Sequence, residues 1–227
     1  MSPVQGARAR ARVEVTAAIK DEARRQLAAD GAAKLSLRAV ARELGMVSSA
    51  LYRYFPSRDE LLTALIVDAY DAVGATAEAA LTATATPRAR WTAVCCAVRA
   101  WAVAHPHEYA LIYGSPVPGY SAPQATVAPA SRVAHALLSV LRDAHRGDGV
   151  APPPLARDMR AEADRLTADL APDLPPSLVV AFVGAWCQLF GLISFEVFGH
   201  FNRVVEEPET FFAHSADRLG RDLGLLR

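Results

Sequence analysis

Hydrophobic residues recur every three or four positions along most of the chain, which is the spacing of a helix that buries one face. In the first such segment, from about Val13 to Asp30, Val15, Ile19 and Leu27 share a face, and Gly31 follows as a stop signal. The apolar–polar alternation of a strand is never sustained, whereas the good helix formers Ala, Leu, Arg and Glu fill most segments. The pattern predicts an all-α protein of about nine or ten helices.

Further periodic segments are separated by joints rich in proline and glycine, the longest at residues 114–120 and 147–154. Ser36 and Ser57 stand where N-caps are expected, and Asp59 and Glu60 follow Ser57 in a first turn, where the helix dipole favours acids. We predict helices at about 37–44, 48–55, 58–81, 87–105, 107–113, 124–145, 157–170, 177–201 and 208–223.

Two of these helices are short and meet at a glycine. Each has one apolar face, and Gly45 between them can take the positive φ that a tight turn needs. Ala41 is small where the two helices must cross closely. Residues 36–55 therefore predict a helix-turn-helix whose second helix enters the major groove of DNA.

One segment raises the question of a membrane. No charged residue occurs from Leu174 to Phe195, which is long enough for a transmembrane helix. It begins with two prolines, however, its upstream flank is acidic, and no basic cluster anchors either end. A helix that is apolar all round can equally be the central helix of a soluble bundle, and we favour that interpretation over membrane insertion.

The overall charge is zero, with 24 basic and 24 acidic side chains, but the charges are unevenly distributed. Residues 1–60 hold 11 basic and 7 acidic residues, a net of +4, and the remainder has a net of −4. A basic part joined to an acidic part suggests contact with nucleic acid. Three cysteines make neither a disulfide framework nor a zinc spacing, and the first residues lack the apolar core of a secretory signal, so a cytoplasmic location is expected.

Residues from Val13 to about Leu65 resemble the TetR family of bacterial transcriptional regulators. The resemblance rests on S-L-R-x-V-A-x-E-L-G from Ser36 and on L-Y-R-Y-F-P-S-R-D-E-L from Leu51. It implies an N-terminal three-helix DNA-binding domain, a larger helical C-terminal domain, a two-fold dimer, and a small molecule that releases the protein from DNA. We expect a flexible basic arm at 1–12, a DNA-binding domain at 13–60 and a ligand-binding and dimerisation domain at 61–227.

The same resemblance assigns DNA contacts by position. Tyr52 looks like the tyrosine that packs on the DNA backbone, while Tyr54 and Arg58 stand where the family usually has His and Lys and should touch phosphates. Arg38 and Ser48 are the candidates for base edges. Ala50 stands where Thr is common, so one hydroxyl contact is missing unless Ser49 replaces it. The expected DNA-binding residues are Ser36, Arg38, Ser48, Ser49, Tyr52, Arg53, Tyr54 and Arg58, and the arm with Arg8, Arg10 and Arg12 could reach the minor groove or only add electrostatic affinity.

The C-terminal part is interpreted from its residues alone, because the resemblance is weak there. Its aromatic side chains fall at helical spacings, which is typical either of a core or of a mostly apolar cavity with a few polar anchors. The candidate ligand-binding residues are Trp101, Tyr109, Tyr113, Trp186 and Phe190. Small residues on the apolar helix would let a second subunit's helix approach, giving a four-helix seam at Ala181, Gly184, Ala185, Gln188, Gly191, Phe211, Ser215 and Leu219.

The expected function is therefore that of a homodimeric repressor that binds a palindromic operator and is released by a small, largely apolar effector. The alternative is an all-α enzyme that uses the aromatic cavity, but no nucleophile elbow, zinc-protease motif or phosphate loop occurs. No catalytic residue, metal site or cofactor is expected. The effector, the operator and the direction of the response are not specified by the sequence.

Overall fold

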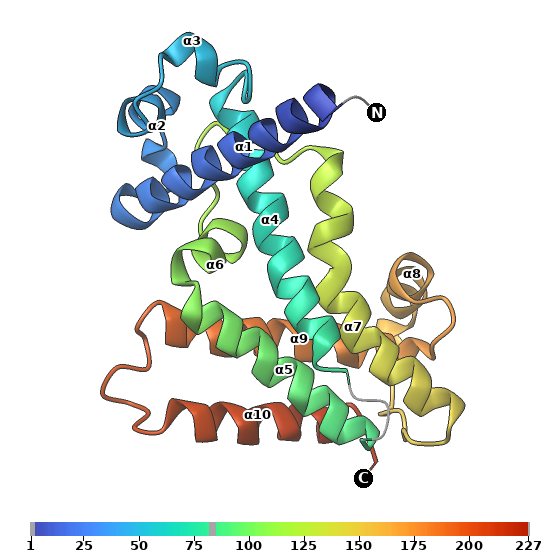
Figure 1. Ribbon diagram of the computed structural model, residues 1–227. Coiled ribbons are helices and arrows are strands. Elements are labelled where there is room, and N and C mark those ends of the chain that lie inside the picture. Colours follow the sequence, from blue (N-terminus) through green and yellow to red (C-terminus); the bar gives the residue numbers. More distant parts are fainter. Residues whose placement is uncertain (1–2, 82–84, 227) are drawn as a thin grey trace. The chain divides into compact units, whose positions relative to one another are not determined.

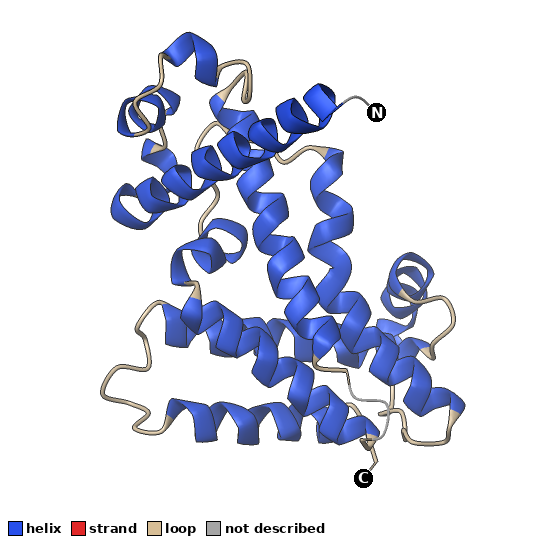
Figure 2. Cartoon of the chain, viewed as in Figure 1, coloured by secondary structure: helices blue, strands red, loops and turns tan. Residues whose placement is uncertain are grey.

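The computed structural model describes residues 3–81 and 85–226, and within these residues every regular element is a helix (Figures 1 and 2). The α-helices are α1 (Pro3–Asp30), α2 (Leu37–Glu43), α3 (Ser48–Leu51), α4 (Arg58–Ala79), α5 (Pro87–Ala104), α6 (Pro106–Tyr113), α7 (Val127–Arg146), α8 (Arg160–Leu170), α9 (Pro176–Val197) and α10 (Pro208–Asp222). Short 3-10 turns occupy Ala32–Lys34, Gln124–Thr126 and Arg157–Met159. The all-α prediction is confirmed.

The chain forms two compact units, each with its own core. The first unit comprises residues 1–70 and 105–129, and the second comprises residues 71–104 and 130–227. The division falls inside α4, at Tyr70, and not at the expected boundary after residue 60. The helix α6 also belongs to the first unit, although the sequence pattern placed it in the C-terminal domain.

The first unit is built around the long helix α1. Its buried face carries Ile19, Ala23 and Leu27, which lie in one hydrophobic core with residues of α2, α3 and α4. Leu51 of α3 and Leu61 of α4 are completely buried in this core. The core therefore holds the two short helices against α1 and the start of α4.

The first helix begins earlier than predicted. From Pro3 onward, the residues expected to form a flexible basic arm lie in α1. The alternation of Ala and Arg at residues 7–12 explains the difference, since both residue types have high helix propensity. For α3, the predicted range 48–55 was too long, because the helix ends at Leu51 and residues 52–54 form a turn.

In the second unit, α5 and α10 run side by side and both pack on α9, which also carries α8 (Figure 1). Trp91 of α5 is fully buried, and its indole N–H donates to the Ala216 carbonyl of α10 at 3.1 Å. Arg99 of α5 donates twice to the Glu196 carboxylate of α9, at 2.6 and 2.7 Å, with both side chains about 14% exposed. A charged side chain that is largely removed from water is costly unless an opposite charge pairs with it in such a geometry.

The uncharged segment forms α9, which is long and apolar enough to cross a membrane by length and composition alone. The central helix of a water-soluble bundle meets the same criterion. Seven of its side chains are buried against the rest of the unit: Leu178, Val179, Phe182, Ala185, Leu189, Phe190 and Ile193. Packing within the protein thus accounts for one face of this apolar helix.

Candidate nucleic-acid interface

The turn between α2 and α3 is a hydrogen-bonded helix stop. Gly45 has φ of 63°, its N–H donates to the Arg42 carbonyl at 3.1 Å, and the Met46 N–H donates to the Ala41 carbonyl at 2.8 Å. This pair of bonds is the Schellman arrangement, in which a residue in the left-handed region satisfies the last carbonyls of a helix. The predicted glycine turn is present, and it sets the angle at which α3 leaves α2.

The start of α2 is held by Ser36. Its hydroxyl oxygen accepts from the Ala39 N–H at 3.4 Å, as an N-cap does, and its own N–H donates to Gln26 Oε1 on α1 at 3.4 Å. Ser57 caps α4 in the same way, accepting from the Glu60 N–H at 3.1 Å. Both caps agree with the sequence prediction. The Ser36 hydroxyl is therefore already engaged in a protein contact, and its role at DNA stays a prediction.

Opposite faces of the short helices have opposite character. Val40, Ala41 and Leu51 are at most 1% exposed, and Phe55 is also buried. The other face is exposed and polar, and carries Arg38, Ser48, Ser49, Tyr52 and Arg53. Tyr52 keeps 41% of its surface accessible, which leaves its ring available to a partner. Five of the eight residues expected at DNA thus lie exposed on α2, on α3 and on the turn that follows α3.

Tyr54 is only half exposed and is held by a residue that sequence reasoning treated as part of a flexible arm. The guanidinium carbon of Arg12 lies 5.2 Å from the centre of the Tyr54 ring, within the range of a cation–π contact. Arg12 Nη2 also approaches the Arg53 carbonyl oxygen at 3.5 Å. The 41-residue separation left no local signal for this contact.

Arg58 is directed toward the protein. Its Nη2 donates to the Ala32 carbonyl at 2.8 Å and to the Ala33 carbonyl at 3.4 Å, and its side chain is 29% exposed. It thereby ties the start of α4 to the turn that precedes α2. A guanidinium has five donor hydrogens, more than these bonds use, and the contact of Arg58 with phosphate stays a prediction.

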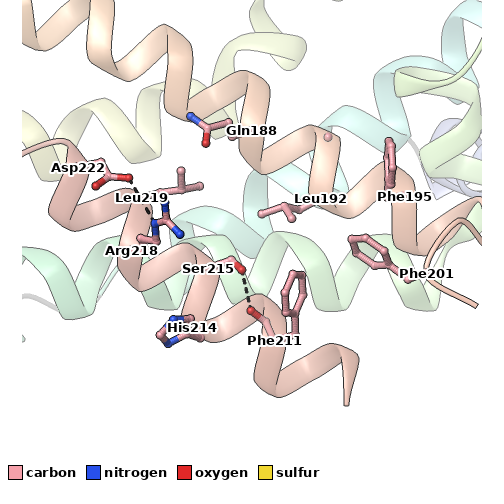
Figure 3. A pocket seen from close by; sticks show the side chains of 11 residues that line it. Gln188, Leu192, Phe195, Phe201, Phe211, His214, Ser215, Arg218, Leu219 and Asp222 are labelled. Atoms are coloured by element: carbon pink, nitrogen blue, oxygen red, sulfur yellow. Dashed lines mark hydrogen bonds and ion pairs between the residues drawn. The ribbon is translucent and has the colours of Figure 1, made fainter. Parts of the chain in front are cut away.

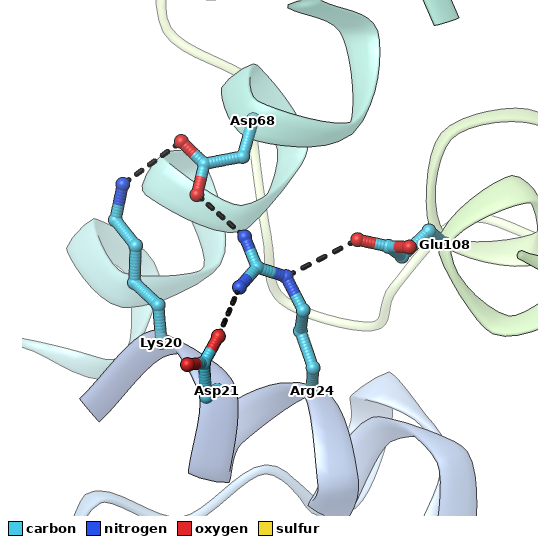
Figure 4. A network of polar contacts seen from close by, with 5 residues as sticks. All are labelled: Lys20, Asp21, Arg24, Asp68 and Glu108. Carbon is cyan, nitrogen blue, oxygen red and sulfur yellow. Dashed lines mark hydrogen bonds and ion pairs between the residues drawn. The ribbon is translucent and has the colours of Figure 1, made fainter. Parts of the chain in front are cut away.

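Polar side chains connect α1, α4 and α6 within the first unit (Figure 4). Arg24 binds Asp68 of α4 at 2.8 Å, Glu108 of α6 at 3.1 Å and Asp21 at 2.7 Å, while Lys20 binds the other oxygen of Asp68 at 2.8 Å. Sequence reasoning missed this network because its partners lie up to 84 residues apart. The network joins α6 to α1, the helix against which α2 and α3 pack.

The five candidate ligand residues fall in different units, two tyrosines in the first and the other three residues in the second. In the first unit, the Tyr109 and Tyr113 rings lie 5.2 Å apart, and Tyr113 meets Tyr70 edge-on at 5.9 Å. Burial raises the pKa of the Tyr70 and Tyr113 phenols, and neighbouring phenols raise it further. Both phenols therefore stay neutral in the physiological pH range.

In the second unit, the aromatic residues of α9 form a continuous stack. Trp186 lies between Phe182 and Phe190, with ring centroids 6.1 and 4.5 Å apart. Phe190 and Trp101 are buried, whereas Trp186 is half-buried. The predicted helical stripe is present, but its members belong at least partly to the core.

A groove of about 520 Å³ runs between α9 and α10 on the surface of the second unit (Figure 3). Phe195, Phe201 and Phe211 gather along it, with successive ring centroids 5.8 and 5.7 Å apart. Five residues predicted for the dimer seam line this groove: Gln188, Gly191, Phe211, Ser215 and Leu219.

Not every residue predicted for the seam is open to a partner. A side chain at Gly184 would meet nothing within 4 Å, so this position is open. Ala185 is only 4% exposed, and Leu219, although it borders the groove, is 5% exposed. Both side chains are therefore largely covered by their own protomer. Ala185 differs from its exposed neighbour Gly184 because a step of one residue around a helix changes the face by about 100°. The place of Ala185 and Leu219 in the dimer seam stays a prediction.

Comparison with known proteins agrees with this architecture. Residues 19–65 match the family described as "Bacterial regulatory proteins, tetR family", and residues 91–219 match "Tetracyclin repressor-like, C-terminal domain". The chain is 42% identical over 219 residues to the HTH-type transcriptional regulator Rv1816 of Mycobacterium tuberculosis, with 91% of each chain covered. Among solved structures, the regulatory protein SCO4313 is 36% identical, with a TM-score of 0.74 over 92% of this chain and 97% of that one.

Two further structures show the same fold at low identity. The TetR family regulator PfmR from Thermus thermophilus is 19% identical, with a TM-score of 0.60 over 92% of this chain and 99% of that one. A TetR variant from Acinetobacter baumannii, solved in complex with minocycline, is 14% identical, with a TM-score of 0.52 over 91% of this chain and 96% of that one. The matches to both parts of the chain and the identity along nearly its whole length agree: the chain belongs to the TetR family of bacterial transcriptional regulators, which act by binding DNA and not as enzymes.

Proposed function

We propose that the protein is a homodimeric repressor that binds a palindromic operator and leaves it when a small, largely apolar effector binds. The proposal of DNA binding is supported by the opposite faces of the helix-turn-helix. Val40 and Leu51 are buried, whereas Arg38, Ser48 and Tyr52 are exposed beside them. A surface of arginine, hydroxyl and tyrosine side chains on a short helix suits base edges and phosphates in a major groove.

Two-fold symmetry follows from the proposed operator. Each protomer presents one α3, and two such helices read successive major grooves only if they lie about 34–36 Å apart or a multiple of that distance. The groove between α9 and α10 supports a dimer, because it exposes aromatic side chains beside positions where Gly184 and Gly191 leave open space. A regulator that acts on the chromosome works in the cytoplasm, and the proposal includes no membrane.

The DNA contacts are tested by measuring the affinity of Arg38→Ala and Tyr52→Ala for a duplex selected from a random pool by the wild-type protein. Losing a side chain that reads a base costs about 1–3 kcal/mol, so Arg38→Ala should bind about 5- to 150-fold more weakly at each half-site and with relaxed sequence preference. Tyr52→Ala should weaken binding to all sequences alike.

The matched control is Arg165→Ala, which removes one exposed arginine from α8 in the second unit. It should leave affinity within experimental error of wild type. Equal affinities of all three variants at one salt concentration would contradict the assignment of Arg38 and Tyr52.

The effector part rests on the aromatic residues of the second unit. Trp101 and Phe190 are buried and Trp186 is half-buried, and large apolar side chains of this kind are typical of sites that bind an apolar molecule. Minocycline, which is bound in the Acinetobacter structure, is a suitable first compound in a panel of apolar small molecules. An effector should quench tryptophan fluorescence, less so in Trp186→Phe, and should lower operator affinity at the same concentration. A compound that binds without changing operator affinity would not be the effector.

A further inference from the structure

The N-terminal turns of α1 extend past the core of the first unit as a basic helix. The helix begins at Pro3, whereas its first fully buried residue is Ile19. Arg8, Arg10 and Arg12 lie on the intervening turns, and all three side chains are exposed. A rigid helix gives each of these arginines a definite direction, which a flexible arm would not.

The direction of each arginine follows from the helix geometry. At about 100° per residue, Arg12 and Arg8 each point within about 20° of the direction of Ile19, and Arg10 points about 180° away. Ile19 faces the core shared with α2 and α3. Arg12 and Arg8 therefore continue that face beyond the edge of the core, on the side of the helix-turn-helix, whereas Arg10 faces the opposite side.

Contacts of Arg12 agree with this direction. Its guanidinium lies over the Tyr54 ring at 5.2 Å and reaches the Arg53 carbonyl at 3.5 Å, immediately after α3. A cation beside the last carbonyls of a helix is favourable, and the stacked guanidinium restricts the ring. Arg12 thus restricts Tyr54, the residue that the family resemblance places at a phosphate.

Arg8 stands one turn further out on the same face as Arg12. Two arginines four residues apart repel each other on an isolated helix, and an anion between or beside them relieves that repulsion. If Tyr54 contacts one DNA phosphate, the next phosphate along the same backbone is the nearest further anion.

From this geometry we propose that the first turns of α1 are part of the DNA-binding surface, with Arg12 positioning Tyr54 and Arg8 binding a backbone phosphate that flanks the half-site. The inference rests on the proposed operator binding and adds a second element to it. Arg10 carries the same charge on the same helix but faces away from this surface.

The experiment measures fluorescence anisotropy of Arg8→Ala, Arg10→Ala and Arg12→Ala on two labelled duplexes, between about 50 and 200 mM salt. One duplex is selected from a random pool by the wild-type protein, and the other is an unrelated duplex of equal length. Arg8→Ala should reduce the slope of log K against log salt by about 0.9 for each bound protomer and weaken both duplexes. Arg10→Ala, the matched control, should change the slope by less than half as much.

Arg12 is tested by its coupling to Tyr54. Arg12→Ala should weaken the selected duplex about two- to fivefold for each protomer, the range expected of an exposed cation–π pair. In a Tyr54→Leu background that loss should disappear, while the effect of Arg8→Ala should persist. A general effect on folding would not depend on Tyr54, and unchanged thermal unfolding midpoints check that the exposed substitutions leave the fold intact.

The possible outcomes separate the two proposals. If the wild-type protein enriches no sequence from the random pool and does not bind the unrelated duplex, the proposed function fails and this inference fails with it. If the wild type binds but Arg8→Ala and Arg10→Ala change the slope equally, the charge acts diffusely and only the inference is overturned. An Arg12→Ala loss that is the same with Leu at position 54 overturns the positioning role.

Discussion

At the scale of the residue, a single backbone angle decides how the helix-turn-helix is formed. Gly45 adopts φ of 63°, and a Cβ built there would meet nothing within 4 Å, so no packing reason requires a glycine at this position. The requirement is conformational, because a side chain in the left-handed region clashes with its own backbone.

Gly45→Ala should therefore destabilise the protein by about 1–2 kcal/mol without altering any contact of a side chain. Urea unfolding followed by circular dichroism measures this difference. Gly147→Ala is the control, since Gly147 has no positive φ and a Cβ there is in ordinary contact with Asp143. Its stability should change little, and equal stabilities of the two variants would contradict the conformational argument.

At the scale of the element, the pairing of α5 with α10 depends on a close approach between Trp91 and Gly220. A Cβ on Gly220 would lie 3.1 Å from Trp91 Cδ1 and 3.3 Å from Arg88 Cγ, closer than a side chain normally comes. The indole is held in place by its hydrogen bond to the Ala216 carbonyl, so it has little freedom to move away.

Gly220→Val should overpack this contact and destabilise the second unit by about 1–3 kcal/mol. Differential scanning calorimetry would show the loss as a lower midpoint of unfolding. Arg221→Val places the same side chain one residue further along α10 at an exposed position and should leave the midpoint nearly unchanged. If both variants unfold at the same temperature, Gly220 is not required for the approach of the two helices.

At the scale of the whole molecule, the proposed dimer would cover the exposed aromatic side chains between α9 and α10. Phe211 is 41% exposed and Phe195 is 53% exposed, and both line the groove. Exposed aromatic residues in one groove are typical of surfaces that bind a partner.

Phe211→Glu should weaken the dimer by at least about 30-fold, because it puts a charge into the centre of the seam. Light scattering coupled to size-exclusion chromatography measures the mass in solution. The control is Leu170→Glu, which charges an equally exposed apolar side chain on α8, 44% exposed and outside the groove. Two variants of equal mass would show that this groove is not the dimer seam.

Charge distribution also acts at this scale. The chain is neutral overall, yet residues 1–60 carry a net of +4 and include the exposed Arg38, Arg53 and the arginines of α1. The excess is modest, and ion pairs such as Lys20–Asp68 already use part of it. Electrostatic attraction to DNA is therefore limited to a few side chains whose directions the helices define.

Much of the DNA-binding unit could be predicted from the sequence because its determinants are short-range. The helical spacing around Leu51, the cap at Ser36 and the positive φ at Gly45 each involve neighbours within a few residues, and the structure confirms all three. The length of α3 was overestimated because the first stop signal after it in the sequence is Pro56. The start of α1 was missed because an Ala–Arg segment can be helical or disordered.

The sequence by itself thus determined the helices, their turn and the exposed polar row of Arg38, Ser48 and Tyr52. Only the tertiary structure decided that α6 joins the N-terminal unit, that Arg58 binds the Ala32 carbonyl and that Arg12 stacks on Tyr54. The contacts of Arg58 and Arg12, like the Arg24–Glu108 pair, join residues 26 to 84 positions apart. No local pattern encodes such pairs, because they form only when packing of the apolar faces has brought distant segments together.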